Sequence, residues 1–338
     1  CFCRTGEKIA WQMKIPTVAS FHLQPEKVTY SIGFGKNSLA SDALYRFFYR
    51  SFYSCFRYIH CPSDMIAKEL IRRGYDAQCR VISNGVSDLF RPMQILRPPP
   101  LQGKFVVLMI GRLSAEKRQD ILIEAARHSK YADRIQLIYA GQGPNESKYR
   151  RLGKRLPNPP IFAFYSQEEL LGLINASDLY VHASDTEIEG ISCMEAAACG
   201  VVPIISDSEL SATKSFALHP WSLFHAGDAR SLVERIDYWI EHSQEKRETG
   251  RLYAQRAGQM RVSRCAMEME ALYKDVIADY WSNGYKAPEE PRLSRITYPF
   301  AGRTTAVYSK TMPSASGYAH ASGSLECADK ANAAETCG

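Results

Sequence analysis

Short runs of apolar, largely β-branched residues alternate with amphipathic helical segments along most of this chain. The expected strands are residues 17–21, 58–61, 79–82, 105–110, 136–140, 179–182 and 201–205. The expected helices are residues 41–56, 63–73, 118–128, 167–174, 193–198, 231–245 and 262–281. Strands that alternate with helices form βαβ units, which are built on parallel sheets. The chain is therefore predicted to be an α/β protein.

A proline-rich stretch at residues 91–103 divides the chain into two blocks, 1–98 and 99–264. A helix at 265–281 follows, and then a tail at 282–338 in which 31 of 57 residues are Gly, Pro, Ser, Ala or Thr. We expect that tail to be disordered because it cannot bury a core. Almost no chain precedes the strand expected at 17–21, so the first block is expected to be incomplete at its start.

The basic residues are concentrated at the front of the chain. Residues 1–100 carry 14 Lys or Arg and 7 Asp or Glu, whereas residues 101–338 carry 28 and 29. Such a basic excess can bind an anionic membrane, an anionic substrate or nucleic acid. It is equally typical of a solvated surface that binds no partner. The chain lacks a recognisable nucleic-acid-binding module, so we expect no nucleic-acid partner.

Ten cysteines are scattered along the chain without a Cys-x-x-Cys pair or a zinc-ligand spacing. They are expected to be buried, reduced thiols of a cytoplasmic protein. We expect no signal peptide, and no apolar run of the sequence is long enough to span a bilayer.

The most informative stretch follows the strand expected at 179–182. Glu187 and Glu195 stand eight positions apart, and Gly190 forms a turn between them. A helix that begins near Ile191 would aim the free N–H groups of Gly190, Ile191 and Ser192 at one place, which suits a phosphate. The two carboxylates can accept hydrogen bonds from sugar or ribose hydroxyls. The alternative is a pair of surface glutamates that flank a helix start.

A second stretch, Gly111 to Lys117, follows the strand expected at 105–110. Arg112 and Lys117 would lie beyond the carboxyl end of a parallel strand, where open α/β sheets bind ligands. Two cations there would neutralise a diphosphate, although a solvated turn is an equally simple interpretation. His22 occupies a similar place after the first expected strand, ahead of a proline turn, and can be either functional or structural.

Aromatic residues and arginines are interleaved over residues 45–58. This segment could lie on a membrane surface, with its arginines facing anionic lipid. We favour core packing, because the aromatic side chains surround nearly the whole helix.

Together these stretches resemble the GT-B glycosyltransferases of family 4, also called glycosyl transferases group 1. The resemblance covers residues 16–281. It rests on the E-x7-E motif from Glu187 to Glu195, the G-R-L-S-x-E-K turn at 111–117, the A-G-x-G-P turn at 140–144, and the segment 81–86. The sequences of the segments 182–195, 21–26 and 211–214 are most similar to those of the subgroup of 1,2-diacylglycerol 3-glucosyltransferases.

The resemblance implies two Rossmann-like domains whose parallel sheets face each other across a cleft. Residues 1–98 would be part of the acceptor-side domain, residues 99–264 the nucleotide-sugar domain, and 265–281 the helix that returns to the first. The implied donor-binding residues are Gly111, Arg112, Lys117, Gly190, Ile191, Ser192 and Glu195, with Glu195 on the ribose. His22 and Glu187 are the implied catalytic residues, on the transferred sugar.

The implied reaction is retaining transfer of a hexose, glucose by the subgroup, from a UDP-sugar to a lipid or glycan acceptor. The family uses charged side chains and helix N–H groups on the leaving diphosphate, so we expect no metal and no further cofactor. Contact with an anionic membrane at the inner face of the cell membrane is expected for a lipid acceptor. The alternative is a non-catalytic nucleotide-sugar-binding remnant of such an enzyme.

Overall fold

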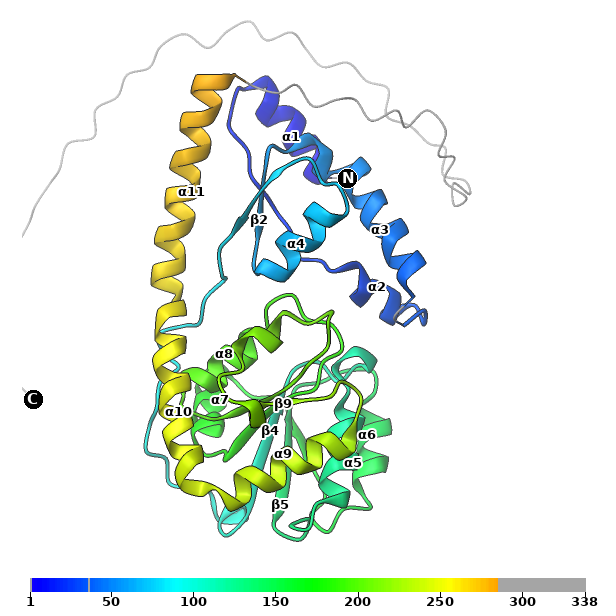
Figure 1. Ribbon diagram of the computed structural model, residues 1–338, viewed down its shortest axis with the longest axis vertical. Coiled ribbons are helices and arrows are strands. Elements are labelled where there is room, and N and C mark those ends of the chain that lie inside the picture. The colour runs from blue at the N-terminus through cyan, green and yellow to red at the C-terminus, as the bar shows by residue number, and fades with distance from the viewer. Residues whose placement is uncertain (1, 36, 285–338) are drawn as a thin grey trace, which may run out of the picture. The chain divides into compact units, whose positions relative to one another are not determined.

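The computed structural model describes residues 2–35 and 37–284, and the side chains of residues 2–5 lie outside that description. The tail expected to be disordered at 282–338 falls almost entirely outside the described residues. Two parallel sheets account for the strands of the described part (Figure 1). The prediction of an α/β protein with parallel sheets is confirmed.

The first block holds a three-stranded sheet in the order β1-β2-β3, formed by β1 (Ala19–Ser20), β2 (Tyr58–Cys61) and β3 (Gln78–Val81). Its helices are α1 (Phe2–Gln12), α2 (Pro25–Ser31), α3 (Ser38–Ser51) and α4 (Asp64–Arg72). Neither α1 nor α2 was expected. A proline turn was predicted after His22, but α2 begins at Pro25, because the fixed φ of proline and its missing N–H suit the first position of a helix.

The segment 45–58 mostly packs into the core of the first block, as favoured from its sequence. Tyr45, Tyr53 and Phe56 are buried, and they pack in a cluster with Phe21 of the first strand region. Phe47 instead is about half exposed on α3. The helix is shorter than expected, since α3 ends at Ser51 and a single 3-10 turn, Tyr53–Cys55, follows it.

The second block holds a six-stranded parallel sheet in the order β6-β5-β4-β7-β8-β9. Its strands are β4 (Phe105–Ile110), β5 (Ile135–Ala140), β6 (Ile161–Ala163), β7 (Leu179–His182), β8 (Pro203–Ser206) and β9 (Leu223–Phe224). The strand order reverses between β4 and β7. In open α/β sheets ligands bind at such a point, beyond the carboxyl ends of the strands.

The helices of the second block are α5 (Gln119–His128), α6 (Glu146–Gly153), α7 (Gln167–Asn175), α8 (Ile191–Ala198), α9 (Ala229–Glu241) and α10 (Ser243–Ala257). In Figure 1, α5 and α6 lie on one side of the sheet and α7 and α8 on the other. One helix was expected at 231–245. Two are present, because His242 leaves the helical region with φ −103° and ψ 57°.

The last described helix, α11 (Val262–Asn283), packs against the first block. Its Leu272, Val276 and Tyr280 form a buried cluster with Tyr58 and Ile82. Its Asp279 forms an ion pair with Arg57, with 2.5 Å between Asp279 Oδ2 and Arg57 Nη1. Within residues 2–35 and 37–284, no helix is both long and apolar enough to cross a bilayer.

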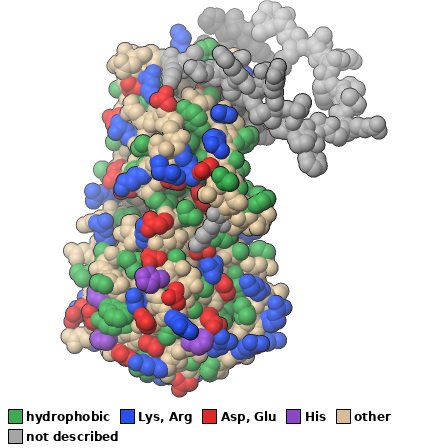
Figure 2. Space-filling view, turned by 45° about the vertical axis from the view of Figure 1, so that its right-hand side comes forward, with side chains coloured by type: hydrophobic (Ala, Val, Ile, Leu, Met, Phe, Trp, Pro, Cys, Tyr) green, Lys and Arg blue, Asp and Glu red, His purple; other side chains and the backbone are tan. Residues whose placement is uncertain are grey.

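The surface seen in Figure 2 carries basic, acidic and apolar side chains interspersed with one another. Among the cysteines whose side chains are described, Cys61, Cys193, Cys199 and Cys265 are buried as expected, whereas Cys55 and Cys79 are only partly buried.

Candidate functional site

The turn after β4 is held against the turn after β5. A Cβ atom at Gly141 would lie 2.2 Å from the carbonyl oxygen of Gly111, so only glycine permits this approach. Lys117 ends a short 3-10 turn, and its ammonium group forms an ion pair with Glu187. Arg112 is exposed and has no ion-pair partner among the described residues. The carboxyl end of β4 therefore presents two cations, one paired and one unpaired.

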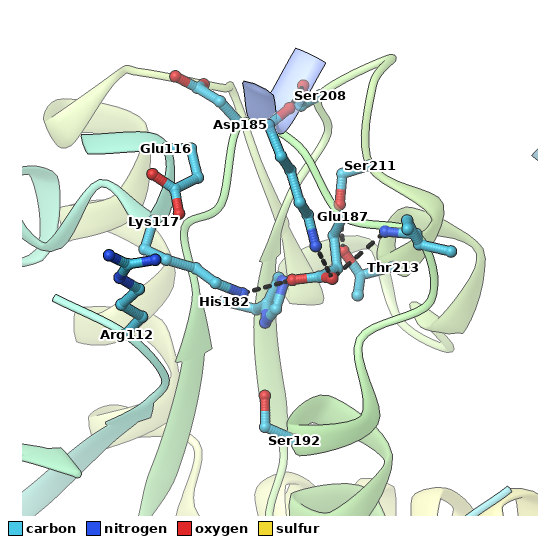
Figure 3. A network of polar contacts seen from close by, with 12 residues as sticks. Arg112, Glu116, Lys117, His182, Asp185, Glu187, Ser192, Ser208, Ser211 and Thr213 are labelled. Atoms are coloured by element: carbon cyan, nitrogen blue, oxygen red, sulfur yellow. Dashed lines mark hydrogen bonds and ion pairs between the residues drawn. The ribbon is translucent and has the colours of Figure 1, made fainter. Parts of the chain in front are cut away.

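Glu187 lies in the loop after β7 and is shared by two lysines. Lys117 pairs with its Oε2 (Figure 3). Lys27 of α2 approaches its Oε1 to 2.9 Å. Burial alone would raise the pKa of this carboxyl, but Lys117 and Lys27 outweigh burial and hold the pKa well below its usual range. Glu187 is thus a permanent anion at any physiological pH.

His182 at the end of β7 lies beside this carboxylate. Its Nε2 is 3.8 Å from Glu187 Oε2. Burial and the nearby Lys117 lower the pKa of His182 to about 3, so the ring is neutral.

Gly190 begins α8 in a conformation that favours glycine, with φ +90°. A Cβ atom there would lie 2.0 Å from Cγ2 of the buried Thr213. The next two residues, Ile191 and Ser192, form the first turn, where an α-helix offers their N–H groups no internal partner. These N–H groups are available to an anion, and α8 has eight residues whose dipoles favour negative charge there.

Glu195 lies one turn further along α8 and is half-buried. Its carboxylate has no hydrogen-bond or ion-pair partner within residues 2–35 and 37–284. Burial raises the pKa of Glu195 to about 7. A desolvated carboxyl group without a partner is suited to hydroxyl groups of a ligand.

Most of these residues line one cavity of about 290 Å³. The predicted site residues among its lining are His22, Lys117, Glu187, Gly190, Ile191 and Ser192. Gly111, Arg112 and Glu195 lie outside that lining. His22 keeps more than a third of its surface exposed, and the partial desolvation of its ring together with the neighbouring His60 lowers its pKa.

Several residues of the cavity were missed by the sequence reasoning. Lys27 of the first block lines it, as does Asn84, which holds the buried Glu189 with its N–H at 2.9 Å and its side-chain amide at 2.5 Å. Ser83 donates to the same carboxylate at 2.5 Å. The segment 81–86 had been noted only as part of a resemblance. No local pattern indicates its pairing with Glu189, because the partners are 105 residues apart.

Comparisons with known proteins address the family directly. The model described as "Glycosyl transferases group 1" matches residues 95–256, and the "Glycosyltransferase Family 4" model matches residues 3–88. The chain belongs to the family 4 glycosyltransferases, also called glycosyl transferases group 1. The family inferred from the motifs is confirmed, and the first match contains the segment from Glu187 to Glu195.

Two curated relatives match parts of the chain. The alpha-monoglucosyldiacylglycerol synthase of Streptococcus pneumoniae is 27% identical over 60% of this chain and 48% of its own length. A phosphatidylinositol N-acetylglucosaminyltransferase subunit of Saccharomyces cerevisiae is 31% identical over 29% of this chain and 23% of its own. The chain therefore spans about half the length of the first relative and about a quarter of the second.

The solved structure of Anabaena HepE, in complex with UDP and glucose, has a TM-score of 0.65 to this chain. It is 19% identical and covers 81% of this chain and 75% of its own. Likeness at this level concerns the fold. The fold is GT-B, as the family resemblance implied.

Proposed function

We propose that this chain carries the donor site of a retaining hexosyltransferase that moves glucose from UDP-glucose to a lipid acceptor. The observation that carries the proposal is the cavity where the start of α8, Lys117 and Glu187 meet. Lys27 and Lys117 bring two ammonium groups to it, and Glu187 brings the carboxylate that they share. The other acidic residue of the lining, Glu189, accepts hydrogen bonds from Ser83 and Asn84. An anionic group that bound in the cavity would meet the free N–H groups of α8 and the ammonium group of Lys117.

The leaving group is where most of the catalytic stabilisation would act. Cleavage of the sugar–phosphate bond develops negative charge on the diphosphate, and preorganised cations and N–H groups stabilise such charge. In this proposal Lys117 exchanges Glu187 for the diphosphate, and Arg112 adds a bidentate contact from the rim. Ile191 and Ser192 provide N–H groups from α8.

The exchange leaves Glu187 available to the sugar. Lys27 still holds one of its oxygens from the first block, at 2.9 Å, so the carboxylate stays in place and stays charged. Glu195 would accept hydrogen bonds from the ribose hydroxyls. His22 faces the same cavity from the other side and would contact the transferred sugar and the acceptor.

Retention would follow if the acceptor hydroxyl attacks from the face that the diphosphate leaves. We propose that the reaction needs no metal, since the cations named above supply the charge that a metal supplies elsewhere. Full turnover after treatment with EDTA is the expected result. A strict requirement for a divalent metal would contradict this part of the proposal.

The choice of UDP, glucose and a lipid is supported by the relatives. The curated names carry diacylglycerol and phosphatidylinositol, and the structure of HepE holds UDP and glucose. A glycan acceptor is the alternative outcome of an acceptor screen. Such a screen would offer UDP-, GDP- and ADP-sugars with diacylglycerol vesicles or oligosaccharides.

A lipid acceptor requires contact with the membrane surface, which we propose at the inner face of the cell membrane through the first block. Exposed apolar residues lie in and around the α2–α3 hairpin, with Ile32, Phe34 and Leu39 each more than half exposed. The exposed Arg46 and Arg50 of α3 follow them. Apolar side chains that can insert and cations that face anionic lipid suit an interfacial site.

The deciding experiment compares the whole chain with two lysine variants. Lys117→Ala should abolish binding of UDP, measured by calorimetry, and turnover of UDP-glucose, measured by release of UDP. Lys154→Ala removes an exposed lysine of the same block and should change neither. Wild-type UDP affinity in Lys117→Ala would refute the site. UDP binding by the wild-type chain without turnover of any sugar would instead identify a non-catalytic binding remnant.

A further inference from the structure

Two residues, Ile188 and Glu189, connect the carboxylate of Glu187 to Gly190 at the start of α8, and we call them the connecting segment. The second block holds the chain on both sides of this segment. The backbone N–H and carbonyl of Glu187 both form hydrogen bonds with the loop after β8, and the Gly190 carbonyl accepts hydrogen bonds from α8. Within residues 2–35 and 37–284, the connecting segment itself makes no backbone–backbone hydrogen bond.

The first block supplies the contacts that hold the connecting segment. The side chain of Ile188 is buried in the apolar core of the first block. The Ile188 carbonyl accepts a hydrogen bond of 2.6 Å from Ser63 Oγ. Glu189 is only 4% exposed, and its Oε1 accepts a hydrogen bond of 2.5 Å from Ser83 Oγ in addition to those from Asn84.

Ser63 occupies the N-cap position of α4. A serine hydroxyl at that position normally accepts a hydrogen bond from the first turn of its own helix. Among the described residues the Ser63 hydroxyl makes no such bond, and it donates instead to Ile188, 125 residues away. This hydroxyl therefore serves the connecting segment rather than α4.

Ser83 lies in the turn that follows β3. Its Oγ accepts a hydrogen bond of 3.0 Å from the N–H of Gly85 and donates to Glu189. Gly85 in turn lies against the start of α11, so closely that a Cβ atom there would be 2.8 Å from Val262 Cα. Glu189 is thus bonded to a turn that is packed tightly in its place.

We propose that Ser63 and Ser83 are positioning residues that set where Glu187 and the start of α8 stand relative to each other. The proposal rests on the proposed donor site. A donor that contacts both the carboxylate and the helix start needs them held to within about 0.5 Å. The connecting segment lies between these two contacts, and the first block is what holds it.

The two serines act on the donor only through the connecting segment. Neither of them lines the donor cavity, and both line a different cavity of about 570 Å³. Removal of either hydroxyl therefore takes away no contact with the donor itself. A change in donor affinity would have to arise from movement of Glu187 or of the start of α8.

The test measures donor affinity and folding stability separately on the whole chain. Ser63→Ala and Ser83→Ala should each raise the Kd for UDP, measured by calorimetry, and the KM for UDP-glucose roughly fivefold, the equivalent of about one hydrogen bond. Ser63→Thr keeps the hydroxyl at an extended position that suits a β-branched residue, and should bind UDP as the wild type does. A lower urea midpoint with unchanged Kd and KM in both alanine variants would overturn the proposal, because the serines would then support only the fold.

Ser87→Ala is the matched control for Ser83→Ala. Ser87 Oγ also accepts from the N–H two positions further on, at Leu89, but no hydrogen bond joins it to the connecting segment in the described part of the chain. The control should change neither Kd nor KM, and equal losses in the two variants would contradict the role of Ser83. Should Ser83→Ala not fold, Ser63→Ala decides the question by itself. A wild-type chain that fails to bind UDP would refute the proposed donor site instead.

Discussion

Alanine at Gly190 should destabilise the second block, and one neighbouring substitution should recover part of the lost stability. A residue with a side chain at φ +90° lowers the free energy of unfolding by about 1–2 kcal/mol. Forcing a methyl group into a filled core lowers it by about 1–3 kcal/mol more. The added Cβ would lie 2.0 Å from Thr213 Cγ2, which is backed by a fully buried environment. Gly190→Ala should therefore lower the free energy of unfolding by about 2–5 kcal/mol.

Thr213→Ser removes only the obstructing methyl group. The serine keeps the hydroxyl that bonds to Ser211, at 2.5 Å, and by itself should cost about 1 kcal/mol for the lost methyl group. In the double variant the nearest atom to the new Cβ is Cβ of residue 213 at 3.5 Å, an ordinary contact. The alanine methyl fills the vacated space, so the double variant should be more stable than Gly190→Ala alone.

Urea unfolding followed by the fluorescence of Trp221 and Trp239 measures these differences in a double-mutant cycle. Gly172→Ala is the control, because a Cβ there meets nothing within 4 Å and α7 gains a better helix former. Destabilisations that simply add in the double variant would refute the contact between positions 190 and 213.

Three further predictions concern charge. Burial raises the pKa of Glu195 to about 7, so the folded state keeps a proton that the unfolded state releases near pH 4.5, and stability falls as pH rises between these values. Glu195→Gln should therefore raise the urea midpoint at pH 8 and leave it nearly unchanged at pH 4, and an equal gain at both would contradict the cause. The pKa of Glu187 is depressed by Lys117 and Lys27 against the effect of burial, so its contribution is complete above about pH 4.5 and is lost at lower pH. Lys27→Met should lower the midpoint at pH 7, and that difference should shrink below pH 4.5; a difference that is constant with pH would exclude the ion pair as its source. Arg46→Ser should weaken sedimentation with phosphatidylglycerol vesicles roughly fivefold, whereas Arg151→Ser on α6 should not, and equal losses would remove α3 from the membrane site.

The elements that the sequence predicted well are those whose residues are buried on both sides. The bounds expected for β2, β4 and β7 agree with the structure, because continuous apolar runs between turn residues are typical of central parallel strands. The edge strands β6 and β9 were missed. They have three and two residues, and pairing with a neighbouring strand defines them more than their own composition does.

The part of the site between Glu187 and Ser192 could also be predicted from residues that are neighbours in the sequence. The spacing from Glu187 to Ser192 places a loop carboxylate, a glycine and a helix start in succession. α8 begins at Ile191, near the start inferred from the turn and two residues before the helix expected at 193–198. The positive φ of Gly190 accords with the turn expected there. The close approach of the Thr213 methyl group is a second reason for glycine at this position, and no local pattern indicates it.

The sequence by itself determined the α/β class, the family, and the two turns that carry Lys117 and Glu187. These follow from periodicity and short motifs, which depend on neighbours within a few residues. Only the tertiary structure decided how the charges are partnered. Lys27 reaches Glu187 from 160 residues away, and His182, whose Nε2 has no hydrogen-bond partner among the described residues, faces the same carboxylate. Ion pairing and desolvation depend on distance in space, so the charge state of the site is a property of the folded chain.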